Sequence, residues 1–286
     1  MNTIKAANNL ACPIDGRRLV LHDKQMICED GHVFDIARQG YVNLLTVQHK
    51  RSKHPGDNKA MVSARTHFLN SGCYEPIANT LADITLAQLA AQKAACILDA
   101  GCGEGYYVDY VFNYLEGKGV GCDLSFIGLD ISKAAIAASA KRNKQITWVV
   151  GTNRQPPVKE GSVDCILCVF GFQHFDGFKK ILKPGGRIIL VEPGPDHLRQ
   201  LREIIYSDVK KATAPGFSCV EDSDFLLVDR QSLQFSTEVM GKQQVNHLLM
   251  MTPHFHRATA SARATLSERE QLKLSIDVVF RILEKK

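Results

Sequence analysis

The chain of 286 residues is long enough for one complete α/β domain and a small additional domain. Hydrophobic residues make up 45% of the sequence, but no apolar run is as long as a membrane span, so we expect no membrane partner. The net charge of +5 allows an anionic partner without requiring one.

Two further features predict a cytoplasmic protein. The segment Met1–Leu10 lacks the apolar block of a secretory signal. Among the nine cysteines, Cys96, Cys165 and Cys168 fall in apolar segments that we expect to form core strands, where cysteine behaves as a small apolar residue. Such buried free thiols are typical of a reducing compartment.

The first segment is short and polar, with cysteine and histidine at spacings that predict a metal site. Two residues separate Cys12 from Asp15, and three separate Cys28 from His32. These gaps are typical of the two turns of a zinc ribbon. A carboxylate oxygen can bind zinc, although it should hold the metal less tightly than a thiolate. The alternative is a ribbon that folds without metal on a small apolar core.

A basic loop with proline and glycine follows the ribbon, from residue 48 to residue 57. Its Lys50, Arg51 and Lys53 can neutralise phosphates and position an RNA without contacting its bases. An ordinary solvated run of charges is the alternative. Residues 61–89 then carry apolar side chains at helical spacing and predict one or two helices.

From residue 96 onward, short apolar runs alternate with helical segments, which predicts a parallel α/β sheet. The predicted strands are Cys96–Asp99, Phe126–Asp130, Ile146–Val150, Asp164–Phe170 and Arg187–Glu192. The predicted helices are those that follow Gly105 and Ser132, and Phe175–Leu182 and Asp196–Lys211. In the tail, the alternation of apolar and polar residues predicts an antiparallel pair of strands, Leu227–Val239 and Leu272–Ile282.

The first of these strands ends in Asp99 and runs into a loop with Gly101, Gly103 and Gly105. Glycines at every second position let the backbone turn sharply and approach a ligand. A dinucleotide site would show G-x-G-x-x-G, with room for a diphosphate. Here Glu104 lies inside the loop, where it would repel a diphosphate but suits a ligand with ammonium and sulfonium charges. We therefore predict an S-adenosylmethionine site, with NAD and a turn without ligand as alternatives.

The second strand also ends in an acid, Asp130, whose carboxylate can accept hydrogen bonds from both hydroxyls of a ribose. Carboxyl ends of adjacent parallel strands lie at one edge of a sheet. Asp99 and Asp130 should therefore flank the same nucleoside pocket.

Several motifs carry a resemblance that covers nearly the whole chain. They are Gly31–Asp35, Gly40–Leu45, Gln48–Asp57, Gly101–Tyr107, Leu129–Lys133, Lys183–Gly186, Pro193–Leu198 and Met251–Pro253. Together they resemble the 23S ribosomal RNA guanine-N1 methyltransferases of the RlmA (RrmA) type. The second and third motifs are the most specific, since many methyltransferases share the glycine loop.

The resemblance implies a fold and a domain organisation. It implies a class I, Rossmann-like α/β methyltransferase domain, with a parallel core sheet and antiparallel C-terminal strands, joined to a small N-terminal zinc-ribbon-like domain. The expected regions are a ribbon for RNA recognition at 1–45, a basic loop and helical linker at 46–95, and the methyltransferase domain at 96–286. A homodimer is also implied.

The resemblance also implies ligand contacts. By match of motif, the residues in contact with S-adenosylmethionine are Tyr74, Gly103, Glu104 and His197. Three zinc ligands match, namely Cys12, Cys28 and His32, while Asp15 replaces the fourth.

The implied reaction is methylation of guanine N1 in 23S rRNA by S-adenosylmethionine. N1 of guanine carries a proton near neutral pH, so a base is needed, and Glu192 and His174 are candidates. A carboxylate that caps the next turn and a surface histidine are the competing explanations. The segment Phe170–His174 departs from the family pattern. Two other functions therefore stay open: a small-molecule class I methyltransferase, and an RNA-binding pseudoenzyme.

Overall fold

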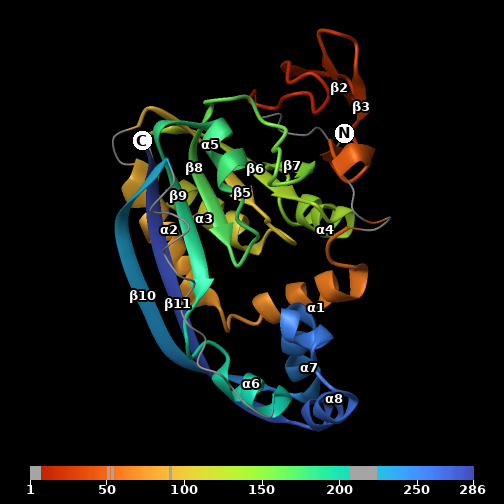
Figure 1. Ribbon diagram of the computed structural model, residues 1–286, viewed down its shortest axis with the longest axis vertical. Coiled ribbons are helices and arrows are strands. Elements are labelled where there is room, and N and C mark those ends of the chain that lie inside the picture. The colour runs from red at the N-terminus through yellow and green to blue at the C-terminus, as the bar shows by residue number, and fades with distance from the viewer. Residues whose placement is uncertain (1–7, 50–51, 53–54, 90–91, 207–223) are drawn as a thin grey trace.

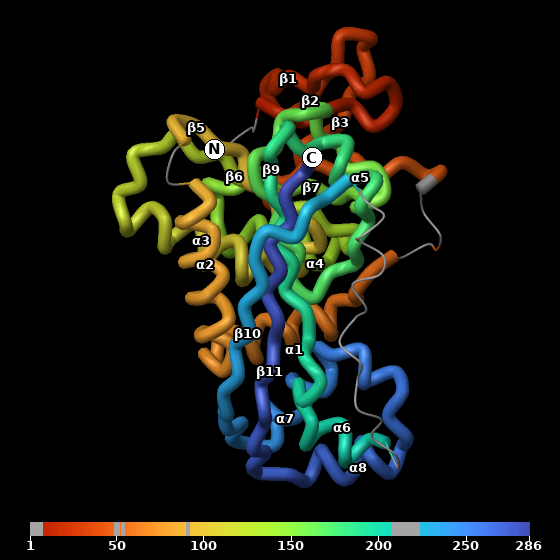
Figure 2. The backbone as a smooth tube through the Cα atoms, turned by 60° about the vertical axis from the view of Figure 1, so that its left-hand side comes forward, coloured from red at the N-terminus to blue at the C-terminus, as the bar shows by residue number. Residues whose placement is uncertain are grey.

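The computed structural model describes residues 8–49, 52, 55–89, 92–206 and 224–286. A small N-terminal ribbon lies at one end of the molecule and a group of helices lies at the other, with one large sheet between them (Figures 1 and 2). The ribbon sheet consists of β1 (Leu19–His22), β2 (Gln25–Cys28) and β3 (Val33–Asp35). The helices at the far end are α6 (Arg199–Ile205), α7 (Lys242–Met251), η3 (Pro253–His256) and α8 (Ala260–Ser267).

The large sheet has eight described strands in the order β10-β11-β9-β8-β5-β6-β7-β4. They are β4 (Tyr41–Asn43), β5 (Ala94–Ala100), β6 (Asp123–Asp130), β7 (Thr147–Val150), β8 (Val163–Val169), β9 (Leu182–Pro193), β10 (Phe225–Met240) and β11 (Gln271–Lys285). All pairs from β4 to β9 are parallel, whereas β11 is antiparallel to both β9 and β10. The expected parallel core with two added antiparallel strands is confirmed. The region 1–45 contains β4, which pairs with β7, so the division at residue 45 stays a prediction.

The remaining α-helices begin close to their predicted positions, whereas the short helix η1 (Val47–His49) overlaps the start of the expected basic loop and was not predicted. These α-helices are α1 (Lys59–Leu69), α2 (Glu75–Leu89), α3 (Tyr106–Gly117), α4 (Lys133–Arg142) and α5 (Phe175–Ile181). Ser132 caps α4, because its hydroxyl accepts the Ala135 N–H at 3.2 Å. The predicted helix Asp196–Lys211 was wrong at its start. Leu198 adopts a left-handed conformation and donates its N–H to Ser275, so α6 begins only at Arg199. Its predicted end lies outside the described residues.

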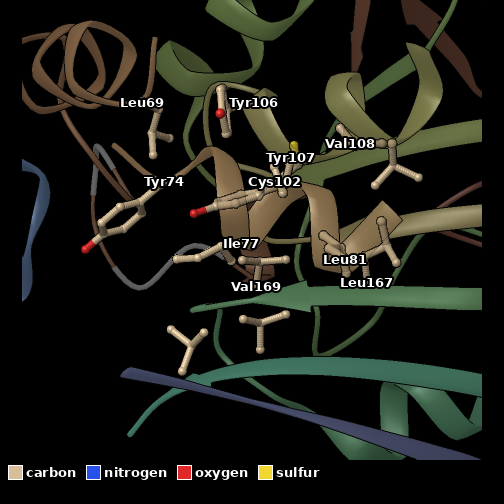
Figure 3. Close-up of a cluster of buried hydrophobic side chains, with 14 of the residues drawn as sticks. Leu69, Tyr74, Ile77, Leu81, Cys102, Tyr106, Tyr107, Val108, Leu167 and Val169 are labelled. Carbon is tan, nitrogen blue, oxygen red and sulfur yellow. The ribbon is translucent and has the colours of Figure 1, made fainter. Parts of the chain in front are cut away.

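Both faces of the parallel core are buried, which explains why its strands are continuous apolar runs. One cluster joins α2 and α3 to the sheet and ends near the carboxyl edge, where Tyr74 and Tyr107 lie at the opposite end from Leu81 and Leu167 (Figure 3). The apolar core therefore extends to the edge at which a ligand of this fold would bind.

Two segments far apart in sequence reach beyond this carboxyl edge. In β11, Val278 pairs with Pro193 at the end of β9, so the first part of β11 continues past the parallel strands. It contacts α6, while α7 packs against α1. The C-terminal helix α7 and the helix α1, which lie far apart in the sequence, thus pack together beyond the same edge (Figure 1).

Candidate functional site

The glycine loop connects β5 to α3 in a conformation that needs its glycines. Gly101, Gly103 and Gly105 all have positive φ, at 91°, 57° and 86°. The N–H groups of Gly101 and Cys102 both donate to the carbonyl of Leu129, at 2.8 and 3.0 Å. The loop is thereby fixed against the end of β6, as the sequence pattern predicts.

The only tryptophan, Trp148 on β7, packs closely against the glycine loop and against β6. A Cβ atom on Gly128 would lie 2.2 Å from its ring, and one on Gly105 would lie 2.7 Å away. The indole N–H donates to the Asn143 carbonyl at 2.8 Å, which holds the ring in place. Gly105 is therefore required both by its dihedral angle and by this close approach.

Three acids converge around the loop. Asp99 and Glu104 are almost fully buried, with 1% and 2% of their surface exposed. Asp130 accepts the N–H of Gly103 at 2.9 Å and that of Ser132 at 2.7 Å. Burial raises the pKa of Asp99 to about 8, and the neighbouring charges of Asp130 and Glu104 add to the rise. The site thus concentrates negative charge where it is costly in the absence of a cation.

Glu104 is partly compensated by Arg142, from the last turn of α4. The two side chains form an ion pair, and the Arg142 Nε also donates to the Glu104 carbonyl at 3.3 Å. Burial raises the pKa of Glu104 and the arginine opposes that rise. The sequence did not reveal this partner. A buried carboxylate is expected to pair with a cation, but the chain has 35 lysines and arginines, and the sequence does not indicate which of them is the partner.

Buried polar atoms without partners indicate where a ligand would bind. Among the described residues, Oδ1 of Asp99, Oε1 of Glu104 and the hydroxyl of Tyr107 are buried and lack a hydrogen-bond partner. Such groups are expensive to bury unless something satisfies them. Two carboxylate oxygens suit a ligand with positive charges, so the residues fit S-adenosylmethionine better than a diphosphate-containing dinucleotide.

Tyr74 and His197, which the resemblance assigns to the methyl donor, are brought together from distant parts of the chain. The Tyr74 hydroxyl lies 3.2 Å from Nε2 of His197. Phe170 stacks on the imidazole, with ring centroids 5.6 Å apart, and the rings of Phe170 and Tyr107 meet edge to face, with centroids 6.4 Å apart. Burial lowers the pKa of His197 to about 4, so the imidazole is neutral at physiological pH. The resulting aromatic wall adjoins the glycine loop.

The two candidate bases lie at the carboxyl ends of later strands. Glu192, near the end of β9, forms an ion pair with Arg281 of β11 and accepts a hydrogen bond from Gln173 at 2.9 Å. His174 instead caps α5, since its Nδ1 accepts the Gly177 N–H at 3.3 Å. The nearby Phe172 is highly exposed.

The N-terminal segment also brings its four predicted ligands together. The donor atoms of Cys12, Asp15, Cys28 and His32 all lie within 4.8 Å of one another. Nδ1 of His32 is 2.9 Å from Oδ2 of Asp15, 3.3 Å from the Cys28 sulfur and 3.6 Å from the Cys12 sulfur. A tetrahedral zinc with bonds of about 2.0 to 2.3 Å separates its ligand atoms by about 3.3 to 3.8 Å. The two distances from His32 to the sulfur atoms lie within this range and the distance to Asp15 is shorter by about 0.4 Å, so a small outward movement of Asp15 would let the four residues hold a zinc ion.

The local backbone explains how the ligands converge. Each pair lies on a tight turn with a glycine at positive φ, Gly16 after the first pair and Gly31 within the second. The Arg17 N–H donates to Asp15 and holds the pKa of that carboxyl well below its usual range. Burial raises the pKa of the Cys12 thiol to about 11.

Two predicted features are limited by what is described. Lys50, Arg51 and Lys53, the predicted RNA contacts, lie outside the described residues. In the described part of the chain, no helix is long and apolar enough to cross a membrane.

The strand order, the glycine loop and the acids at two adjacent strand ends define the methyltransferase part of the chain as a class I, S-adenosylmethionine-dependent enzyme domain. A family described as "Methyltransferase domain" matches residues 97–187. A zinc-ribbon family described as "RlmA, N-terminal" matches residues 10–53.

Similar proteins identify the family. The chain is 28% identical to the "Putative 23S rRNA (guanine-N(1)-)-methyltransferase YxjB" of Bacillus subtilis, over 93% of this chain and 94% of the relative. It is 34% identical to the 23S rRNA (guanine(748)-N(1))-methyltransferase of Streptomyces fradiae, over 67% of this chain and 66% of the relative. It is 32% identical to a "Putative 23S rRNA (guanine-N(1)-)-methyltransferase" of Micromonospora griseorubida, over 68% of each chain. The protein belongs to the RlmA-type 23S rRNA guanine-N1 methyltransferases.

Proposed function

We propose that this protein transfers the methyl group of S-adenosylmethionine to N1 of a guanine in 23S rRNA. The observation that carries the proposal is the pairing of a donor site, built from buried acids, with a similarity to rRNA methyltransferases that spans both the ribbon and the catalytic domain. A small-molecule enzyme would have no need of the ribbon.

The pocket residues have distinct tasks in this reaction. Bound S-adenosylmethionine supplies a methyl group on a positively charged sulfur, which is a good leaving group. Asp99 and Glu104 provide negative charge for the cationic ligand, and Asp130 is placed to accept hydrogen bonds from ribose hydroxyls. The wall of Tyr74 and His197 is buried and excludes water. The protein then acts mainly by alignment of the reacting atoms.

Removal of the guanine N1 proton falls to Glu192 in this proposal. Its carboxylate lies at the carboxyl end of β9 and its charge is balanced by Arg281. His174 is the weaker candidate, because helix capping already uses one of its ring nitrogens. Phe170 and the exposed Phe172 are available to stack an unpaired base, as recognition of single-stranded RNA often requires.

RNA affinity is proposed to come from the N-terminal half. Lys50, Arg51 and Lys53 would contact phosphates, while the ribbon with bound zinc would position the RNA. Zinc would supply structural stability there and no reaction step. The homodimer, the cytoplasmic location and the three-part division at residues 45 and 95 complete the proposal. The eight described cysteines are all free, in keeping with a reducing compartment.

The deciding experiment is methylation of ribosomal RNA. Total rRNA from cells that lack the protein is incubated with the enzyme and radiolabelled S-adenosylmethionine, and the modified site is mapped. Label at a single guanine N1 of 23S rRNA is expected. Donor binding without any RNA label would favour a small-molecule enzyme, and loss of both binding and label would leave the pseudoenzyme.

A further inference from the structure

Arg65 is a cation at the donor site that no motif had assigned. It lies on α1, and its Nη1 is 3.6 Å from where a Cβ atom on Gly103 would be. The guanidinium therefore covers the middle of the glycine loop. Its charge also opposes the rise in pKa that burial causes at Glu104 and Asp130.

Two motifs from opposite ends of the chain hold this side chain in place. Asp57, the last residue of the basic loop motif, forms an ion pair with Nη1. The carbonyl of Met251, the first residue of the Met-Thr-Pro motif, accepts a hydrogen bond from Nη2 at 3.1 Å. Asp57 is itself fixed, because its carbonyl accepts the Ser132 hydroxyl at 2.6 Å. Both motifs thus serve to aim one guanidinium at the glycine loop.

The charges of the pocket leave one part of the methyl donor without a partner. The donor has a sulfonium and an ammonium, which suit the acids, and also a carboxylate, which those acids repel. Arg142 is already paired with Glu104. Arg65 also has partners, Asp57 and the Met251 carbonyl, but its guanidinium carries five N–H donors and is about one quarter exposed, so it can still donate hydrogen bonds to a carboxylate.

We propose that Arg65 binds the carboxylate of the amino-acid end of S-adenosylmethionine, with Asp57 and Met251 as its positioning residues. The inference rests on the proposed function only in that it requires this donor; it does not depend on the RNA substrate. It makes Arg65 the residue that distinguishes the complete donor from adenosyl compounds that lack a carboxylate. We expect this discrimination because a ligand without a carboxylate would leave N–H donors of the Arg65 guanidinium without an acceptor in the complex.

The test compares S-adenosylmethionine with decarboxylated S-adenosylmethionine, which differs only by the carboxylate. Binding of each is measured by calorimetry on the full-length wild type and on Arg65→Gln. We expect the wild type to prefer the complete donor by about 10- to 100-fold, the range of a charge-assisted hydrogen bond. In Arg65→Gln that preference should fall to about twofold or less, with the decarboxylated compound bound as by the wild type.

Arg263→Gln is the matched control. Arg263 also donates to a backbone carbonyl of the C-terminal region, that of Phe255 at 2.8 Å, but lies on α8. Its substitution should leave the preference unchanged. Arg65→Lys, which keeps the charge and loses the planar fork, should retain part of it. Equal weakening of both compounds in Arg65→Gln, or no weakening of either, would overturn the proposal. A wild type that binds neither compound would instead refute the donor site itself.

Discussion

Asp99→Asn should make the protein more stable at neutral pH while it weakens the methyl donor. The pKa of Asp99 is about 8 in the fold, against 3.8 for an ordinary aspartate, because of burial first and of the charges of Asp130 and Glu104 next. Between these two values the folded protein keeps a proton that the unfolded chain has lost. The free energy of unfolding must therefore fall as pH rises through this window.

The size of this effect follows from the slope. One proton corresponds to about 1.4 kcal/mol per pH unit, so this carboxyl should lower the free energy of unfolding by about 4 kcal/mol between pH 5 and pH 8. The Asp99→Asn variant has no carboxyl to titrate at this position. Its free energy of unfolding should therefore fall by about 4 kcal/mol less than that of the wild type between pH 5 and pH 8. Urea unfolding of both proteins at pH 5 and pH 8 measures the difference.

The ionisation of Asp99 should also affect donor binding, but in the opposite direction: affinity for the donor should rise as pH rises. A cationic ligand favours the ionised carboxylate, so binding releases a proton, and affinity should fall about tenfold from pH 7 to pH 6. Calorimetry should show this dependence in the wild type and not in Asp99→Asn. Asp164→Asn is the control, since Asp164 pairs with Lys183 near the amino end of the same sheet. Parallel pH curves for wild type and Asp99→Asn, in both assays, would refute the electrostatic account of the site.

Three further outcomes are expected. Gly128→Ala would force a methyl group into the Trp148 ring, and should lower the free energy of unfolding by about 1 to 3 kcal/mol with a change in tryptophan fluorescence; an unaltered urea midpoint would contradict the packing argument. Elemental analysis should find about one zinc per chain in the wild type and much less in Cys28→Ser, whereas a metal-free wild type would favour a ribbon that folds without zinc. Glu192→Gln should slow single-turnover methylation by about 100-fold or more and His174→Asn should not; if neither slowed it, both candidates would be excluded.

The sequence alone predicted the parts of this protein that depend on local pattern. Continuous apolar runs located β5, β6 and β8, because strands covered on both faces leave no polar side. The spacing of the glycines predicted the loop, because positive φ at alternate positions is accessible to little else. The spacing of the ligand pairs predicted the ribbon site because it too is a local pattern: the two ligands of each pair lie on one short turn.

Contacts between distant residues could not be predicted in the same way. Arg142 follows Glu104 by 38 positions, and Trp148 touches Gly105 and Gly128 only after three strands have assembled. Nothing in the three-residue run of β4 indicated that it would join the large sheet as a parallel edge strand. These contacts depend on which helices and strands become neighbours in the fold. The sequence of one short segment does not determine which elements will lie next to it.

The position of β4 explains how the ribbon and the donor site can act on one RNA, although the ribbon lies at one end of the molecule and the donor site lies at the carboxyl edge of the large sheet (Figures 1 and 2). Because β4 is parallel to β7, it carries the chain from the ribbon to the carboxyl edge, where Leu44 donates to the Val150 carbonyl at 2.9 Å. The chain is fixed again at Asp57, on the Ser132 hydroxyl. Leu44 and Asp57 are thus both fixed by contacts with residues at the ends of β7 and β6, and the basic residues lie between them in the sequence. Substitution of the basic residues Lys50, Arg51 and Lys53 should weaken RNA binding without changing donor affinity, as RNA titration and donor calorimetry on the same variants would measure.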